Sequence, residues 1–300
     1  MTQPDTLDGM PKRLWSCTPT RLDTWLTCPR RYRFTYLEHR SKGAPWAHNS
    51  MGSAVHAALR DWYVAPSAQR TPAYATELVE RQWLSDGFRD TAQSEAWRSR
   101  SAQMAASYVV TQDADEEPVG IERTVSAATH GMALSGRVDR IDLRASADGG
   151  EELVIVDYKT GRHPLTSDDA RSSLALAIYV VSARRTLRMR ARRVELHHLP
   201  SATVAAYEHT EESLERHLGR AEQIAQEASA AEQRWRTDLE PLATSVADGD
   251  AEAIAAVDAV FPAVPSTGCS WCDYRRWCPA GQDASQEIAS WTALGARETD

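Results

Sequence analysis

Lysine is scarce in this 300-residue chain, and the scarcity draws attention to one lysine in particular. Of the 34 lysine and arginine residues only three are lysines, namely Lys12, Lys42 and Lys159. A chain that nearly always uses arginine has placed lysine where a compact, strongly hydrated point charge suits the chemistry. Lys159 follows an apolar run that is typical of a buried strand. Lys159 is therefore the first candidate for a functional residue.

Several other features are absent, and each absence excludes a class of protein. No run of about 18 apolar residues occurs, so we expect no membrane-spanning helix. The first residues lack the basic and apolar regions of a secretory signal, so we expect a cytoplasmic protein. The formal net charge of −8 excludes a uniformly basic nucleic-acid binder but not a local basic groove. No G-x-x-x-x-G-K-[ST] loop is present, so any unwinding of a duplex must come from a partner.

Two strand-like patterns place carboxylates next to Lys159. Residues 133–143 mix β-branched and apolar positions with polar ones, and residues 153–156 form a continuous apolar run. Turn-forming residues between them predict a hairpin. That hairpin would bring Asp139 and Asp157 side by side. Asp157 and Lys159 would point to the same side, because alternate residues of a strand share a face.

Two carboxylates and an ammonium group suit the hydrolysis of phosphodiesters. Carboxylates hold Mg²⁺ or Mn²⁺, which are hard cations that prefer oxygen ligands. The metal polarises the phosphate and lowers the pKa of water, while a lysine orients that water or stabilises developing charge. The alternative is an ordinary strand pair that ends in a surface contact between Asp157 and Lys159, because D-x-K tripeptides are common.

The stretches 136–142 (GRVDRID) and 157–161 (DYKTG) resemble motifs of the RecB-type branch of the PD-(D/E)XK nuclease superfamily. Relatives in that branch include AddB nuclease domains and CRISPR adaptation nucleases. The resemblance implies an α/β fold with a restriction-endonuclease-like core, in which helices flank a central mixed sheet. It also implies metal ligands and a lysine that positions the nucleophile. These are Asp139, Asp157 and the main-chain carbonyl of Tyr158 as ligands, and Lys159 as the catalytic lysine.

Further positions match the pattern of the family. Gly52 and His56 fit its Gly-x-x-x-His element, whose histidine is a metal ligand, although a lone histidine among alanines is more often a core or surface residue. Glu122 resembles the acidic residue ahead of the Gly-x-x-Asp strand and would assist through water; the alternative is a solvated strand residue. Tyr179 matches the tyrosine of a Gln-x-x-x-Tyr element and would hold the DNA backbone. Ala175 stands where the family has glutamine, which removes a polar group expected near the scissile phosphate.

Two arginine-rich segments are expected to contact DNA. Arg30 and Arg31 alternate with aromatic residues, which is typical of a surface that follows a nucleic-acid backbone and stacks bases. The alternative is an amphipathic helix whose arginines reach out to solvent. Arg184 and Arg185 open the most basic stretch of the chain. A charge run is usually a solvated face, but we expect this one to lie beside the metal site and to bind phosphate.

Three cysteines near the C-terminus form a C-x₂-C-x₅-C pattern that converges readily on one metal centre. In a reducing compartment such cysteines indicate metal or redox chemistry before disulfides. The spacing alone leaves zinc and a [4Fe–4S] cluster open, with Cys28 or Cys17 as the fourth ligand. The family resemblance implies a [4Fe–4S] cluster that staples the first helix to the C-terminal tail. Its implied ligands are Cys28, Cys269, Cys272 and Cys278, with Cys17 as a spare thiol.

The predicted organisation has four parts. They are a disordered tail (1–14), an N-terminal helical region that contributes a cysteine and the histidine ligand (15–115), the nuclease core (116–236) and a C-terminal region with the iron–sulfur cysteines (237–300). The predicted function is a metal-dependent DNA nuclease, acting as an exonuclease on single strands or strand ends in repair or recombination. A helicase or repair protein is the expected partner.

Two alternatives of other classes stay open. The first is a catalytically weak or inactive iron–sulfur protein that keeps the nuclease fold and serves as a DNA-binding scaffold. The alanine at position 175 is its best support. The second is a zinc-dependent regulatory factor with a purely structural hairpin. A brown, iron-containing protein would eliminate that second alternative.

Overall fold

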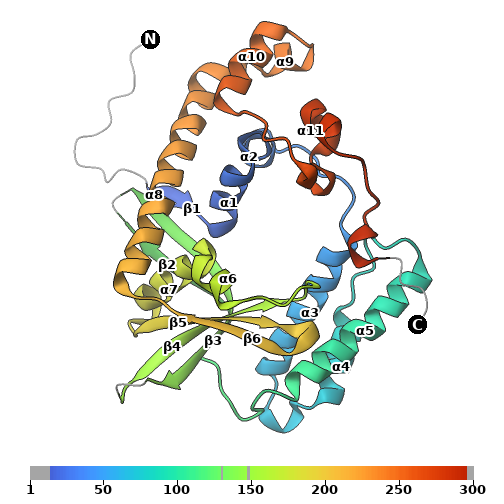
Figure 1. Cartoon of the computed structure of the whole chain (residues 1–300), viewed down its shortest axis with the longest axis vertical. Coiled ribbons are helices and arrows are strands. Elements are labelled where there is room, and N and C mark those ends of the chain that lie inside the picture. Colours follow the sequence, from blue (N-terminus) through green and yellow to red (C-terminus); the bar gives the residue numbers. More distant parts are fainter. Residues whose placement is uncertain (1–13, 130, 147–148, 296–300) are drawn as a thin grey trace.

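The computed structural model describes residues 14–129, 131–146 and 149–295, with helices on both faces of one central mixed sheet (Figure 1). The predicted α/β fold class is confirmed. The tail predicted for residues 1–14 lies, apart from its last residue, outside the described residues. Within the described part of the chain, no helix is both long enough and apolar enough to cross a membrane.

The sheet is organised around its longest strand, β3. Its strands are β1 (Trp15–Cys17), β2 (Gly120–Ala128), β3 (Met132–Ala145), β4 (Glu151–Lys159), β5 (Ala191–His198) and β6 (Thr203–Glu208). One edge of β3 pairs with antiparallel β2, and the other pairs with parallel β1 at its start and antiparallel β4 at its end. β5 is parallel to β4, and β6 is antiparallel to β5. The predicted hairpin is confirmed in β3 and β4, although residues 147–148 of its turn lie outside the described residues.

Most of the helices lie outside the segment from β2 to β6. They are α1 (Pro19–Thr27), α2 (Pro29–Tyr36), α3 (Ala47–Val64), α4 (Pro72–Gln82), α5 (Thr91–Val109), α6 (Ser167–Ser172), α7 (Leu174–Leu187), α8 (Glu211–Arg234), α9 (Ala243–Ala247), α10 (Ala251–Val260) and α11 (Pro279–Ala284). α1 and α2 are separated by Cys28 alone, which has extended backbone. The proline that follows it suits the first turn of a new helix. Cys28 therefore sits at a corner rather than within a helix.

Clusters of buried apolar side chains fix the layers. α3, α4 and α5 pack on the face of β4 that carries Val154, Val156 and Tyr158. α7 packs on the opposite face, with Leu153 and Ile155. Because alternate strand residues share a face, Asp157 and Lys159 lie on the α7 side.

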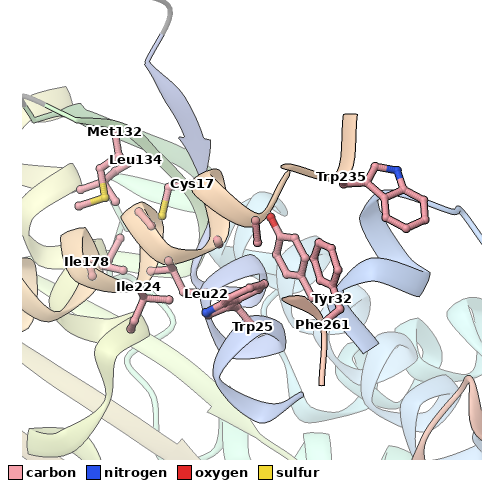
Figure 2. Close-up of a cluster of buried hydrophobic side chains, with 14 of the residues drawn as sticks. Cys17, Leu22, Trp25, Tyr32, Met132, Leu134, Ile178, Ile224, Trp235 and Phe261 are labelled. Atoms are coloured by element: carbon pink, nitrogen blue, oxygen red, sulfur yellow. The ribbon is translucent and has the colours of Figure 1, made fainter. Parts of the chain in front are cut away.

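A further cluster joins α1, α2, β1 and α8 (Figure 2). The ring of Trp25 lies 5.2 Å from that of Tyr32 and 6.1 Å from that of Phe261, both edge to face. Cys17 is fully buried here, and burial raises the pKa of its thiol to about 12. Cys17 is thus a residue of the core.

Two fully buried charges lie within β3. The Nε and Nη2 atoms of Arg140 lie 2.9 and 3.0 Å from the two carboxylate oxygens of Asp142. Arg140 also donates to the hydroxyl of Tyr63 on α3. Arg144 links Asp142, at 2.6 Å, to Glu195 on β5, at 2.9 Å. Because a buried charge is tolerated only with partners, this network ties α3 to the sheet.

Candidate metal centre

Helix α3 brings His56 to the end of the hairpin. Gly52, one turn earlier, packs against Thr160 just beyond β4, where an added side-chain carbon would lie 3.3 Å from the Thr160 hydroxyl oxygen. Residues four apart on a helix share a face, so this close approach also places His56 over the strand ends. His56 Nδ1 lies 3.4 Å from Asp139 Oδ1. The Gly-x-x-x-His spacing therefore has a steric reason.

Asp139 is held between α3 and β4. Its Oδ2 accepts a hydrogen bond from the main-chain N–H of Tyr158 at 2.8 Å, while its Oδ1 faces His56. The bond lies at the end of the hairpin, next to the ladder pair formed by Arg140 and Val156. The carboxylate is thus oriented by groups from two different elements.

Strand β2 supplies a further donor, Glu122. Ile121 pairs with Arg140 and Arg123 with Val138, so Glu122 lies opposite Asp139. Its φ is +46°, in the left-handed region that residues other than glycine adopt at a cost of about 1 kcal/mol or more. Strain of this kind is common where a side chain must be aimed at a functional site.

The three donors form a compact group. One ligand atom each from His56, Glu122 and Asp139 can be chosen so that all lie within 4.8 Å of one another, and no other such group occurs among the described residues. An imidazole and two carboxylates form a donor set that suits Mg²⁺, Mn²⁺ or a related divalent ion. The residues therefore fit the expected metal. The structure places Glu122 inside this group, where the sequence assigned it a role through water.

Asp157 and Lys159 form an ion pair beside the group. Lys159 Nζ lies 2.6 Å from Asp157 Oδ2, and the two side chains point to the same side of β4 as expected. The Lys159 side chain is 46% exposed, so its ammonium group can also meet a bound molecule. Asp157 thus serves as the partner of the lysine in the structure.

The electrostatics of the site favour a cation. Burial raises the pKa of Glu122 and of Asp157, and the charge of Asp139 adds to both shifts. Lys159 opposes the rise at Asp157. Burial alone would lower the pKa of His56, but the hydrogen bond and charge of Asp139, helped by the other two carboxylates, raise it instead. Carboxylates that repel one another and an imidazole drawn towards protonation indicate a place where positive charge is stabilised.

Tyr179 on α7 faces the same group. Its ring packs directly on Gly136 of β3, where an added side-chain carbon would lie 2.4 Å from Tyr179 Cε1. Burial, with the charges of Asp157 and Asp139, raises the pKa of the Tyr179 hydroxyl to about 12. The hydroxyl therefore remains a proton donor at neutral pH. Ala175 precedes Tyr179 by one turn of α7, so this helix face offers no amide there.

We expect Gly136→Ala to lower the free energy of unfolding by about 1–3 kcal/mol, because the new methyl group overlaps the Tyr179 ring. Gly219→Ala is the matched control. Gly219 is exposed on α8 with no atom near the added carbon, so alanine there should raise stability by about 0.5–1 kcal/mol. Urea titration measures both. If both variants changed the free energy of unfolding by the same amount and in the same direction, the steric role of Gly136 would be contradicted.

A family model of the PD-(D/E)XK nuclease superfamily matches residues 16–279. The chain belongs to this superfamily. Two solved structures are similar to this nuclease-superfamily chain. One, described as a candidate exonuclease from Eubacterium rectale, has 10% identity over 69% of this chain and 77% of its own, with a TM-score of 0.46. The other, SSO0001, has 13% identity over 91% and 90%, with a TM-score of 0.34. No curated protein is significantly similar in sequence.

In this PD-(D/E)XK chain the most basic stretch does not lie beside the metal centre. Arg184 donates to the Ala191 carbonyl at 2.6 Å, and Ala191 pairs with the start of β4. Lys159 pairs with the last residue of β5, about 20 Å further along the strands. The expected proximity is wrong, because α7 carries the chain back from the site before β5 begins. Arg184 is also paired with Glu211 at 2.8 Å, while Arg185 is exposed.

The other two predicted DNA-binding arginines lie at the cysteines. Arg30 forms an ion pair with Asp258 at 2.6 Å and lies 3.7 Å from the sulfur of Cys278. Arg31 lines the cavity that the cysteines surround, and its charge favours the thiolate of Cys272, although burial raises the pKa of that thiol. Both arginines therefore place positive charge next to cysteine sulfurs.

Four cysteines from the two ends of the chain surround one cavity of about 100 Å³. They are Cys28, Cys269, Cys272 and Cys278. Gly281 lies against the cluster, since an added side-chain carbon would be 3.5 Å and 3.7 Å from two of the sulfurs. No three of these sulfurs lie within 4.8 Å of one another. The structure thus brings together the four cysteines named from the sequence.

One residue of the site was not singled out from the sequence. Arg137 Nε lies 2.7 Å from Glu122 Oε2, across the pairing of β3 and β2. The signal was present, because Arg137 and Asp139 are alternate residues of one strand and share a face. Its side chain is 71% exposed, which leaves it free to meet an incoming anion as well.

Proposed function

We propose that this protein is a divalent-metal-dependent deoxyribonuclease of the RecB-type branch, acting as an exonuclease on single strands or strand ends. The observation that supports the proposal is the group of His56, Glu122 and Asp139 beside the ion pair of Asp157 and Lys159. Metal donors next to an accessible ammonium group are what phosphodiester hydrolysis requires.

The residues divide the work. Mg²⁺ or Mn²⁺, held by the three donors with Asp157 or the Tyr158 carbonyl completing the set, would polarise the scissile phosphate. Lys159 would position the attacking water and stabilise charge on the phosphate, while Asp157 keeps the ammonium in place. The protonated hydroxyl of Tyr179 would donate to the DNA backbone.

We expect Lys159→Ala to slow Mn²⁺-dependent digestion of end-labelled single-stranded DNA about 10²–10⁴-fold, because the group that positions the nucleophile is lost. Lys42→Ala is the control, since Lys42 is an exposed lysine that pairs with Asp273 at 3.7 Å. It should digest DNA as the wild type does. Gel analysis of the products over time measures the rates and shows the polarity.

Two outcomes would contradict the proposal. If Lys159→Ala and Lys42→Ala both keep the wild-type rate, Lys159 is not catalytic. If the wild type binds DNA but stays inert with Mn²⁺, the protein is the DNA-binding scaffold. That second function is favoured by one observation, the alanine at position 175 in place of a polar residue facing the site.

We also propose that the four clustered cysteines hold a [4Fe–4S] cluster. The four cysteines line one cavity, which supports a metal unit shared by all of them. The guanidinium of Arg30 and the N–H of Ser266, 3.7 and 3.4 Å from two of the sulfurs, would stabilise thiolate charge.

The cellular location, the pathway and the partner of the protein are also proposals. A cytoplasmic role in DNA repair or recombination, beside a helicase or repair partner, suits a nuclease without a nucleotide-binding loop. We also propose that the chain is divided into a tail, a helical region (15–115), a nuclease core (116–236) and an iron–sulfur region (237–300). Limited proteolysis would locate those boundaries.

A further inference from the structure

A cavity of about 860 Å³ opens between α3, α5, the turn after β4 and the C-terminal segment. The segment contributes Ala293 and Leu294, and α5 contributes residues spaced along one face. A volume of this size is in the range of sites for sizeable ligands. The cavity plays no part in the metal chemistry described above.

The cavity lies next to the metal centre, although none of the metal donors and neither residue of the ion pair lines it. Gly52 and Thr160 both line it. Gly52 lies one turn before His56 on α3, and Thr160 follows Lys159 directly. The end of a chain-like molecule lying in the cavity would therefore be close to His56 and to the end of β4.

The charges of the lining suit a polyanion. Arg100 and Arg162 line the cavity and both are exposed, whereas none of its lining residues, all within the described ranges, is acidic. This stands out in a chain whose formal net charge is −8. Local positive charge in a concave site raises the concentration of anions there.

Aromatic rings lie in the lining of the cavity and next to it. Trp97 lines it, with the Arg100 guanidinium 5.1 Å from the ring centroid. His48 also lines the cavity and lies edge to face with Trp271, which is outside the lining, with the ring centroids 5.8 Å apart. Trp271 is 40% exposed although it is a large apolar residue. Cations interleaved with accessible rings suit phosphates alternating with unpaired bases.

We propose that this cavity binds a single nucleic-acid strand with unpaired bases and leads its end to the metal centre. Arg100 and Arg162 meet the phosphates, while Trp97 and Trp271 stack on bases. Delivery of the strand end to the metal centre rests on the proposed nuclease function. Binding of the strand itself needs neither metal nor catalysis.

The test is equilibrium binding of a fluorescent (dT)₁₂ strand in EDTA, followed by anisotropy. Ser107→Trp places a large ring in the cavity from an exposed position on α5 and should weaken binding at least tenfold. Ser99→Trp is the matched control, because Ser99 is exposed on the same helix but does not line the cavity. It should bind as the wild type does. Equal binding by the two variants overturns the proposal.

Two further variants keep the test decisive if Ser107→Trp fails to fold. Trp271→Ala should weaken (dT)₁₂ about fivefold or more and leave an abasic strand of equal length unaffected. Arg162→Gln should reduce the slope of log affinity against log salt by about 0.7, the value for one phosphate contact on a single strand. An abasic strand that binds as tightly as (dT)₁₂, or an unchanged slope, overturns the proposal.

Hydrolysis of bis-p-nitrophenyl phosphate with Mn²⁺ separates this proposal from the nuclease assignment, because so small an ester needs no strand path. If the wild type cleaves neither this ester nor DNA while the binding differences hold, the strand site stands and the nuclease function fails. If the wild type cleaves both and Ser107→Trp binds (dT)₁₂ normally, the nuclease function stands and the strand site is refuted.

Discussion

Arg140→Met should lower the free energy of unfolding by about 3–5 kcal/mol. The side chains of Arg140 and Asp142 are both fully buried, so removing the guanidinium leaves a carboxylate without its main partner in a medium that solvates it poorly. The change also removes a hydrogen bond to Tyr63 on α3. Because α3 carries His56, the loss should loosen the helix that positions the metal donor. Urea or thermal unfolding measures the free energy.

Two variants separate this effect from a general loss of arginine. Arg137→Met changes an arginine on the same strand whose side chain is 71% exposed, and it should alter stability by less than about 1 kcal/mol. Arg140→Met combined with Asp142→Leu removes both charges and should recover much of the loss. Arg144 then keeps its contact with Glu195 at 2.9 Å. If the double variant is less stable than Arg140→Met, the desolvated carboxylate is not the cause.

The parts of the site that follow from short-range geometry could be predicted from the sequence. The period of two along a strand puts Asp157 and Lys159 on one face, and the structure pairs them at 2.6 Å. The period of a helix puts Gly52 under His56, and the closeness of Gly52 to Thr160 shows why glycine is needed. These rules act within one element or one hairpin, so they hold before the fold is known.

Features that depend on the direction of elements were not predictable in this way. The basic stretch that begins in the last turn of α7 was expected near the metal centre because it is near in sequence, yet α7 carries it to the far end of the strands. The three-residue strand β1 has no pattern of its own and forms only because Met132–Leu134 offers it a free edge. The position of Glu122 depends on a left-handed backbone conformation that no residue type in that segment indicates.

The C-terminal part of the chain shows the same limit. Spacing predicted that three cysteines converge, and the family resemblance supplied the fourth. The cavity between α3, α5 and the C-terminal segment had no signal in the sequence, because its wall is formed where residues 293 and 294 meet α3 and α5. Contacts between segments some 200 residues apart are set by the whole fold.

Cys28→Ala should abolish binding of the proposed cluster and lower the free energy of unfolding by about 3–5 kcal/mol. The four cysteines join residue 28 to residues 269–278, so ligation closes a loop of about 240 residues. Closing such a loop restricts the unfolded chain, which a long disulfide does with a similar gain in stability. Iron content, visible absorbance and urea unfolding of protein purified without oxygen provide the measurements.

Cys17→Ala is the control, because it makes the same chemical change at a fully buried cysteine that lies outside the cysteine cavity. It should keep its iron and lose only about 1 kcal/mol, the effect of a small cavity in the core. A wild-type protein that contains zinc and no iron would refute the cluster and favour a single-ion site. If Cys28→Ala kept its full metal content, Cys28 would not be a ligand. The staple between the two ends of the chain would then be lost as well, because the other three cysteines are close in sequence and close no long loop.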